Sequence, residues 1–162
     1  MKTIATRTAL FMLLVPGLLI GVLPVWLMST EPALFSFGFL RWLAIPLWAA
    51  GAAAMIWCAR AFTVHGRGTP SPTDPPRELV VCGLYAWVRN PIYDSAVIFL
   101  LGHVLWHPAL PILLMPTIVA VSSLLFVIIY EEPHLRRLFG ARYEAYCASV
   151  PRWLPRMKRS GS

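Results

Sequence analysis

Charged residues are scarce in this chain of 162 residues: they make up 13% of it, whereas hydrophobic residues make up 58%. So few polar side chains could not cover the surface of a water-soluble globule of this size. The composition therefore excludes an ordinary soluble domain and indicates a protein whose solvent is the lipid bilayer. The length suits one domain, and the chain contains no internal repeat and no low-complexity linker.

Cysteines are also few, and the three present, Cys58, Cys82 and Cys147, show no C-x-x-C spacing. This pattern predicts neither a disulfide framework nor a zinc site. His103 and His107 lie four residues apart, but no third ligand accompanies them, so we expect no metal site. The chain contains neither a G-x-G-x-x-G turn nor a phosphate-binding P-loop, which excludes a Rossmann-type nucleotide site.

Acidic residues are outnumbered, with 7 Asp and Glu against 14 Lys and Arg, which gives a net charge of +7. A basic excess can indicate nucleic-acid binding. Here, however, the basic residues separate apolar runs instead of forming a continuous stripe. We therefore expect no nucleic-acid partner and interpret the basic residues as charges that flank a membrane.

Long apolar runs make up most of the rest of the chain. A helix needs about 20 apolar residues to cross a hydrocarbon core about 30 Å thick. Three runs meet this length, and a shorter fourth begins where Asn90 suits a helix N-cap and Pro91 suits the first helical position. The sequence thus predicts an all-α integral membrane protein with about four transmembrane helices. The expected helices are residues 8–28, 39–62, 91–106 and 109–130.

A cytoplasmic loop over residues 63–90 and a C-terminal segment over residues 131–150 complete the single predicted domain. Apolar residues recur at helical spacing in the C-terminal segment, which predicts an amphipathic helix at the membrane surface. Gly140 interrupts the pattern, and we expect a break there. Within the second apolar run, the small residues at 49–54 should let a neighbouring helix approach closely.

Positive charge is distributed unevenly along this predicted topology. Every Lys and Arg except Arg41 falls in the N-terminal tail, in residues 60–89 or after residue 135. The positive-inside rule favours the cytoplasm for such segments. The sequence therefore predicts that both termini are cytoplasmic, and we expect a bacterial inner membrane as the location.

Two segments on that side carry more polar residues than a connector needs. A loop as long as residues 63–90 is usually functional in a compact protein. Glu131 and Glu132 follow an uncharged helix, and carboxylates there are costly unless they meet a cation or hydrogen-bond donors. If Pro133 instead begins a new helix, the helix dipole favours the pair and no partner is needed. The spacing alone leaves both interpretations open.

Taken together, these segments resemble the membrane methyltransferases that include isoprenylcysteine carboxyl methyltransferases and phospholipid methyltransferases. The resemblance covers about residues 64–155. It lies first in Gly83-Leu84-Tyr85-Ala86-Trp87-Val88-Arg89-Asn90-Pro91-Ile92-Tyr93, and then in Glu131-Glu132, Leu135, Phe139-Gly140, Tyr143, Tyr146 and Val150-Pro151-Arg152.

This resemblance implies an enzyme that transfers a methyl group from S-adenosyl-L-methionine to a lipophilic or membrane-associated acceptor. It also implies a cofactor pocket between residues 79–93 and the end of the fourth helix, with Glu131 against a polar or cationic part of the cofactor. As catalytic residues we expect Arg89 and Glu132, the latter as a base for an amine acceptor. The implied cofactor-binding residues are Leu79, Val80, Tyr85, Asn90, Pro91, Ile92, Tyr93 and Glu131.

Three positions bear on the acceptor. Asn90 stands where the carboxyl methyltransferases carry His, Val127 stands where they carry an Arg, and Asp94 follows Tyr93 where Gly is common. We therefore expect a lipid or lipophilic small-molecule substrate with an amine headgroup or another nucleophile, and not a prenylcysteine. The alternatives are an NADPH-dependent membrane reductase of related architecture and a catalytically inactive membrane scaffold. The oligomeric state is not indicated.

Overall fold

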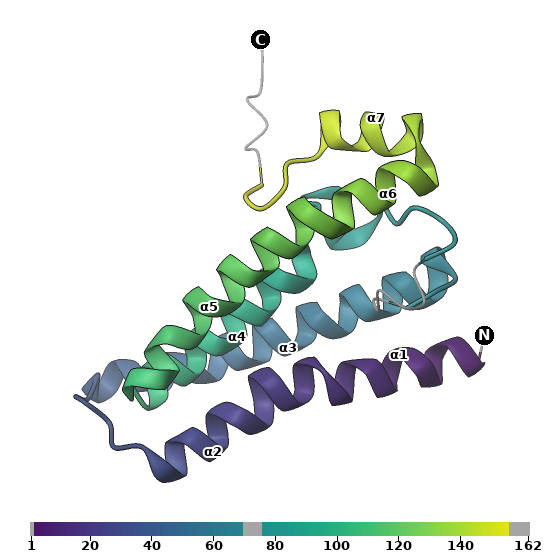
Figure 1. Cartoon of the computed structure of the whole chain (residues 1–162). Helices are drawn as coiled ribbons and strands as arrows, with labels where there is room; N and C mark the ends of the chain where they lie inside the picture. The colour runs from purple at the N-terminus through teal and green to yellow at the C-terminus, as the bar shows by residue number, and fades with distance from the viewer. Residues whose placement is uncertain (1, 70–75, 156–162) are drawn as a thin grey trace.

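The computed structural model of the chain describes residues 2–69 and 76–155, which form helices and connecting segments with no strand among them. Three helical stretches are long and apolar enough to cross a membrane, and a fourth apolar helix is shorter. Figure 1 shows successive stretches running in opposite directions along one bundle. The prediction of an all-α membrane protein is confirmed.

The first stretch is one apolar rod from Thr3 to Thr30. It consists of α1 (Lys2–Leu14), a π-helical portion η1 (Gly17–Val22) and α2 (Leu23–Thr30). The rod is tied to the second stretch by a polar contact near its start, where the Thr63 hydroxyl donates a 3.2 Å hydrogen bond to the Thr8 hydroxyl.

The second stretch makes a close contact with a neighbouring helix. It consists of η2 (Gly38–Leu43), α3 (Ala44–Ala61) and the π-helical turn η3 (Phe62–Gly66). A Cβ atom placed on Gly51 would lie 2.8 Å from Cβ of Phe99 and 2.8 Å from the Ser95 carbonyl oxygen. The small residues expected to admit a neighbouring helix therefore admit α4 (Pro91–Trp106).

The short helix α4 starts at the predicted residue but not with the predicted cap. Asn90 occupies the N-cap position, and its carbonyl accepts the backbone N–H of Tyr93 and of Asp94. Its side-chain amide makes no capping bond. The Nδ2 group instead donates a 3.1 Å hydrogen bond to the carbonyl of Arg152. Asn90 therefore joins α4 to the C-terminal segment.

The last long stretch begins with α5 (Leu110–Phe126) and passes through the π-helical turn η5 (Val127–Glu131) into α6 (Glu132–Phe139). Pro133 has no backbone N–H and would crowd the carbonyl four residues earlier in a regular α-helix. The wider π-helical turn just before it relieves that conflict. Gly140 then adopts φ 53° and ψ −129°, a conformation that glycine tolerates, and the chain turns into α7 (Ala141–Ser149).

The apolar stripe of α6 and α7 packs against protein. Tyr143, Tyr146 and Val150 are buried in one cluster, against which Leu79 and Leu135 pack. An amphipathic pattern shows that one face is apolar, but it does not distinguish a protein core from a membrane surface. These residues hold the 79–85 segment, whereas Leu138 of the same stripe is 49% exposed. The position of this helix at the membrane surface stays a prediction.

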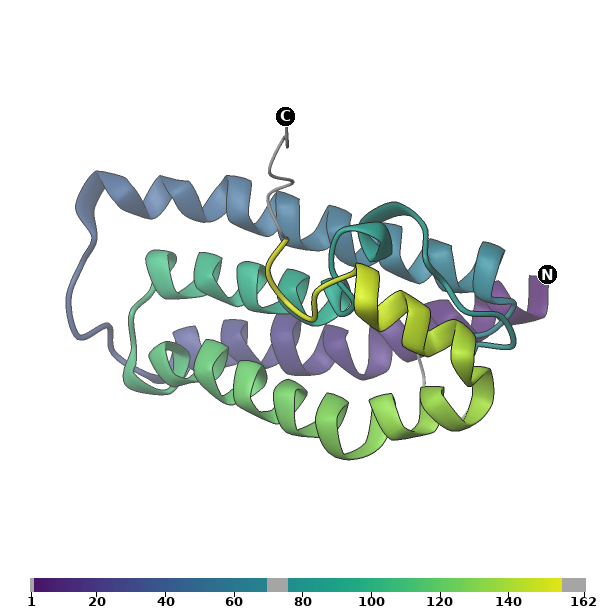
Figure 2. The ribbon, with the colours of Figure 1, turned by 90° about the horizontal axis from the view of Figure 1, so that it is seen from above.

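One end of the bundle collects the segments that the sequence singled out. In Figures 1 and 2 the start of α1, the end of α3, α6 and α7 all lie at this end. The chain between α3 and α4 also returns there and includes the short 3-10 helix η4 (Gly83–Ala86). The fold thus brings residues 79–93 next to the junction of α5 and α6, although about 40 residues separate them in sequence.

Candidate active site

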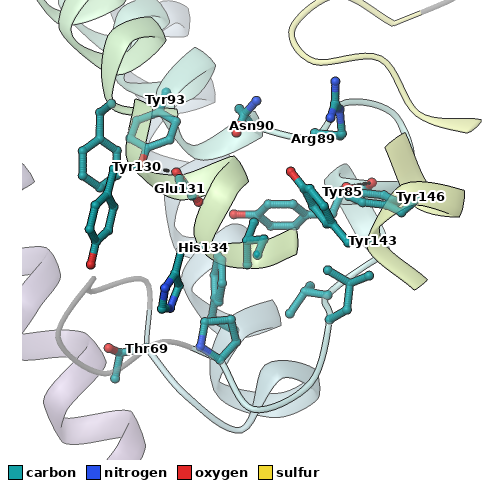
Figure 3. Close-up of a pocket in the computed structure, with 16 residues that line it drawn as sticks. Thr69, Tyr85, Arg89, Asn90, Tyr93, Tyr130, Glu131, His134, Tyr143 and Tyr146 are labelled. Atoms are coloured by element: carbon teal, nitrogen blue, oxygen red, sulfur yellow. Dashed lines mark hydrogen bonds between the residues drawn. The ribbon is translucent and has the colours of Figure 1, made fainter. Parts of the chain in front are cut away.

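A cavity of about 70 Å³ lies between the 79–93 segment and the α5–α6 junction, and Figure 3 shows the side chains around it. We refer to it as the aromatic cavity because half of its lining residues carry aromatic rings. Its lining residues are Phe62, Thr69, Pro76, Leu79, Val80, Tyr85, Arg89, Asn90, Tyr93, Phe126, Tyr130, Glu131, His134, Leu135, Tyr143 and Tyr146.

The carboxylate in the aromatic cavity is Glu131, the last residue of η5. The Tyr93 hydroxyl, from the first turn of α4, donates a 2.9 Å hydrogen bond to its Oε2 atom, as the dashed line in Figure 3 marks. No other hydrogen bond or ion pair to this carboxylate occurs within residues 2–69 and 76–155. Glu131 therefore keeps acceptor capacity for a ligand in the cavity.

Three polar atoms of the lining residues are buried without a partner among the described residues. One is Nε of Arg89, whose Nη1 lies 3.2 Å from Glu132. The other two are the hydroxyl of Tyr85 and Nε2 of His134. Burial, followed by the nearby Cys58 and Glu131 groups, raises the pKa of the Tyr85 phenol well above its ordinary value. Tyr85 is therefore a neutral phenol at physiological pH. A buried polar group normally has a partner, so the Tyr85 and His134 atoms indicate a ligand or water in the cavity.

Aromatic rings in contact with one another form part of the cavity wall. Phe62 meets Tyr85 edge to face with centroids 5.4 Å apart. One helical turn apart on η5 and α6, Tyr130 and His134 stack with centroids 5.9 Å apart. Aromatic faces attract cations and also stack on planar rings. The walls therefore suit a ligand that carries a positive charge or a flat heterocycle.

Glu132 has a different environment from its neighbour Glu131. Its carboxylate is buried and accepts hydrogen bonds of 2.7 and 3.0 Å from Arg152. Arg89 lies 3.2 Å from the same carboxylate, and Arg136 lies 3.9 Å from it. The bond to Glu132 also raises the pKa of the Arg152 guanidinium. Glu132 thus holds a cluster of arginines together and does not line the aromatic cavity.

This arginine cluster fixes the C-terminal segment over the 83–93 segment. The backbone N–H of Arg89 donates a 2.9 Å bond to the Pro151 carbonyl. The hydroxyl of Tyr146 donates a 2.6 Å bond to the Tyr85 carbonyl. Together with the bond from Asn90 to Arg152, these contacts set the backbone position of Tyr85 and Asn90 at the cavity.

Most of the residues predicted for the site do line the cavity. Pro91 and Ile92 do not: Pro91 is buried at the start of α4, and Ile92 packs against the apolar cluster that contains Tyr85 and Val80. Glu132 is also absent from the lining. Those that line the cavity are Leu79, Val80, Tyr85, Arg89, Asn90, Tyr93 and Glu131.

Four lining residues, Tyr130, His134, Tyr143 and Tyr146, were not among the predicted site residues, although the last two belong to the resemblance pattern. A signal for the first two was present, because residues four apart on a helix share a face. Tyr143 and Tyr146 belonged to the apolar stripe of the C-terminal segment. Burial raises the pKa of both phenols, so they are neutral and can donate hydrogen bonds.

Comparison with known proteins supports the resemblance seen in the sequence. The phospholipid methyltransferase family matches residues 39–142. That range runs from η2 into α7 and contains the 79–93 segment together with both carboxylates, Glu131 and Glu132. Neither the curated proteins nor the solved structures gave a match. Because the match covers more than half of the chain, this protein belongs to the phospholipid methyltransferase family.

Proposed function

We propose that this membrane protein transfers a methyl group from S-adenosyl-L-methionine to a lipophilic acceptor that reaches it from the bilayer. The observation that carries the proposal is the aromatic cavity, in which the Glu131 carboxylate and the unpartnered Tyr85 hydroxyl face a space walled by rings. The family match supports methyl transfer in general, and the cavity supports this cofactor.

The chemistry of the lining fits that cofactor. When bound, S-adenosyl-L-methionine supplies a methyl group on a positively charged sulfur, which leaves as a neutral thioether. Glu131 offers a negative partner for a positive group, and the rings of Tyr85 and Tyr130 offer faces for a cation or an adenine. Tyr85 and His134 each offer a buried polar atom that a ligand can satisfy.

The enclosed volume holds only part of such a molecule. Sites that enclose a whole small ligand measure about 300–1,000 Å³. The aromatic cavity measures about 70 Å³, enough for one end of the ligand. Side chains at its rim must therefore move outward when the whole cofactor binds. Tyr130 is the candidate, since it lines the cavity and is 44% exposed.

The residues of this chain then align the reactants and exclude water. Methyl transfer from a sulfonium mainly needs orientation, because the methyl group is already activated. Buried apolar residues such as Val80, together with the rings of Tyr85 and Tyr143, keep water out of the cavity. Charged interactions in such a site are stronger than in water.

The base role expected for Glu132 is not part of this proposal. Three arginine side chains surround its carboxylate and it lies outside the cavity lining. A carboxylate stabilised as an anion by such partners is a poor proton acceptor. Nη1 of Arg89 likewise contacts both the Glu132 carboxylate and Sγ of Cys147. We assign both to positioning of the site.

Orientation in the membrane is proposed from charge. The start of α1, the end of α3 and the helices α6 and α7, which carry basic residues, share one end of the bundle in Figure 1, and the positive-inside rule favours the cytoplasm for that end. Arg41 lies in η2, at the start of the second stretch, and its guanidinium lies over the rings of Trp42 and Trp106 at 5.2 and 5.3 Å from their centroids. We therefore propose cytoplasmic termini and a bacterial inner membrane as the location.

A transfer assay tests the function. Purified protein in detergent is incubated with methyl-labelled S-adenosyl-L-methionine and a total bacterial lipid extract, and the label in the organic phase is measured. We expect labelled lipid in proportion to protein, and less of it with Glu131→Gln. An absence of labelled lipid at any protein concentration would contradict the proposal.

A further inference from the structure

A second and larger hollow lies on the other side of Tyr93. It measures about 800 Å³, within the range of sites for small ligands, and its lining is almost entirely apolar. We call it the apolar groove. Side chains of α3, α4 and α5 form its walls, together with Trp87 and residues 153–155; among them are Ala54, Val97, Ile98, Val121, Leu124 and Trp153.

Resting on the proposed function, we propose that the apolar groove binds the methyl acceptor, that the acceptor is a lipophilic amine, and that Asp94 pairs with its ammonium. The groove is accessible from the side of the bundle, because Val121 and Ile98 are 50% and 37% exposed. Both lie on apolar helices, α5 and α4, so an acyl chain can enter from the bilayer.

Asp94 gives the groove its charge. Of the residues that line it, all within the described part of the chain, Asp94 alone is charged. No hydrogen bond or ion pair to its carboxylate occurs within residues 2–69 and 76–155. The helix dipole favours an acid in the first turn of α4, but an apolar groove is a costly place for an unpaired carboxylate. A cationic ligand group removes that cost.

The same charge has no basic partner in the lining, because no Lys or Arg lines the groove among the described residues. Arg152 precedes the rim residue Trp153, but its guanidinium is bound to Glu132. Within residues 2–69 and 76–155, the groove lining therefore offers Asp94 no cation of the protein itself, and an ammonium of the ligand can take that place. The neighbouring Ser95 hydroxyl already donates a 2.6 Å bond to the Pro91 carbonyl and is not free for a headgroup.

Tyr93 connects the two binding spaces. Its side chain lines both the aromatic cavity and the apolar groove, and its hydroxyl points to Glu131 in Figure 3. Asp94 is the next residue on α4, so an ammonium paired with it lies beside this shared wall. Before transfer, the Asp94 carboxylate accepts one proton from the ammonium. The neutral amine nitrogen, about 3–3.5 Å from the methyl carbon, then forms the new N–C bond as the S–C bond breaks and the sulfur leaves as a neutral thioether. The edge of Tyr93 is where the two ligands can meet.

The test uses three probes with one chain length and different heads: octylamine, octanol and octyl phosphate. Each is titrated at pH 7.5 into the purified full chain in detergent, and binding is followed by the fluorescence of tryptophans such as Trp87 and Trp153, which line the groove. We expect octylamine to bind at least about ten-fold more tightly than octanol, and octyl phosphate to bind most weakly. Asp94→Asn should remove the preference for the amine and leave the affinity for octanol unchanged.

Two further variants make the result decisive. Glu144→Gln removes an exposed carboxylate on α7 and should keep the order of the three probes. Ile98→Trp fills the groove and should weaken all three probes by a similar factor, which tests the location even if Asp94→Asn does not fold. Equal affinities for amine and alcohol in wild type, tightest binding of octyl phosphate, or a preference that persists in Asp94→Asn would each overturn the proposal.

Failure of this inference can be told apart from failure of the proposed function. S-adenosyl-L-methionine is titrated into the same wild-type preparation. If wild type binds this cofactor but shows no preference for octylamine, the acceptor assignment is wrong and the proposed methyltransferase function stands. If wild type prefers octylamine but does not bind the cofactor, the amine site stands and the proposed methyltransferase function is wrong.

Discussion

Tyr93 and Glu131, 38 residues apart in the chain, are joined by a 2.9 Å hydrogen bond from the phenol to Oε2 of the carboxylate. This bond places Glu131 against the aromatic cavity. The next carboxylate, Glu132, is held by Arg152 at 2.7 Å and belongs to the arginine cluster. Two adjacent acids thus have separate environments, and the first two predictions test whether they have separate functions.

Replacing Glu131 with Gln should weaken cofactor binding. A hydrogen bond to a charged group contributes roughly 1.5–3 kcal/mol, so the dissociation constant for S-adenosyl-L-methionine should rise about ten- to hundred-fold. The amide oxygen of Gln can still accept the Tyr93 bond, so the fold should remain intact. Isothermal titration of the variant and of wild type in the same detergent measures the change.

The matched control is Glu144→Gln, which removes an exposed carboxylate that pairs with Arg136 at 2.9 Å. Its cofactor affinity should equal that of wild type. An unchanged affinity in a well-folded Glu131→Gln protein would remove Glu131 from the site and leave Tyr85 as the main polar contact.

Replacing Glu132 with Gln should lower stability. The change leaves Arg89, whose side chain is 11% exposed, without its anionic partner. Breaking a buried ion pair by removing one member costs about 3–5 kcal/mol. The corresponding cost at the exposed Glu144 should be about 0–1 kcal/mol. Thermal melts of both variants in detergent should therefore show a clear loss of Tm for Glu132→Gln alone.

The opposite pattern would restore the role first expected for Glu132. If Glu132→Gln melts like wild type, binds S-adenosyl-L-methionine normally and yet transfers no methyl group, then this carboxylate acts as the base and not as the anchor of the arginines.

The fold could be predicted from the sequence because its main signals are local. Apolar runs of sufficient length specify the long helices in a bilayer. Asn90 followed by Pro91 specifies the start of α4, and Gly140 specifies the turn between α6 and α7. The partners of side chains are not local. The bond from the Asn90 amide to the Arg152 carbonyl spans 62 residues, and no spacing within α4 indicates it.

The candidate site was predicted in part for the same reason. The resemblance supplied Tyr85, Tyr93 and Glu131, but it also implied Glu132. The side chain of Glu132 differs from that of Glu131 only in the direction in which it leaves the helix. The π-helical turn η5 sets that direction, and it depends on Pro133 and on packing. The apolar stripe that includes Tyr143 could not reveal whether it faces lipid or protein.

Packing of α3 on α4 gives a separate prediction. Gly51→Ala would place a Cβ atom 2.8 Å from Cβ of Phe99 and 2.9 Å from the Phe99 backbone nitrogen. Overpacking of this kind costs about 1–3 kcal/mol, so Tm in detergent should fall. The control is Gly21→Ala in η1, where nothing lies within 4 Å of the added carbon. Equal Tm values for the two variants would contradict the close packing of α3 against α4 at Gly51.

The proposed orientation can be tested with reporters at both termini. A fluorescent protein that folds only in the cytoplasm should fluoresce at either end. Alkaline phosphatase, which is active only outside the cytoplasm, should be inactive at either end. The reason is that every Lys and Arg except Arg41 flanks the same side of the predicted topology. Active phosphatase at the C-terminus would reverse the orientation.

The central claim is that the aromatic cavity binds S-adenosyl-L-methionine, and the most direct measurement is a titration of the purified protein in detergent with this cofactor, with S-adenosylhomocysteine and with NADPH. The phosphates of NADPH would call for clustered cations, whereas the unpaired charge in this cavity is the carboxylate of Glu131. We predict saturable binding of the two methionine-derived compounds and none of NADPH. Tight binding of NADPH with no binding of S-adenosyl-L-methionine or S-adenosylhomocysteine would contradict the account.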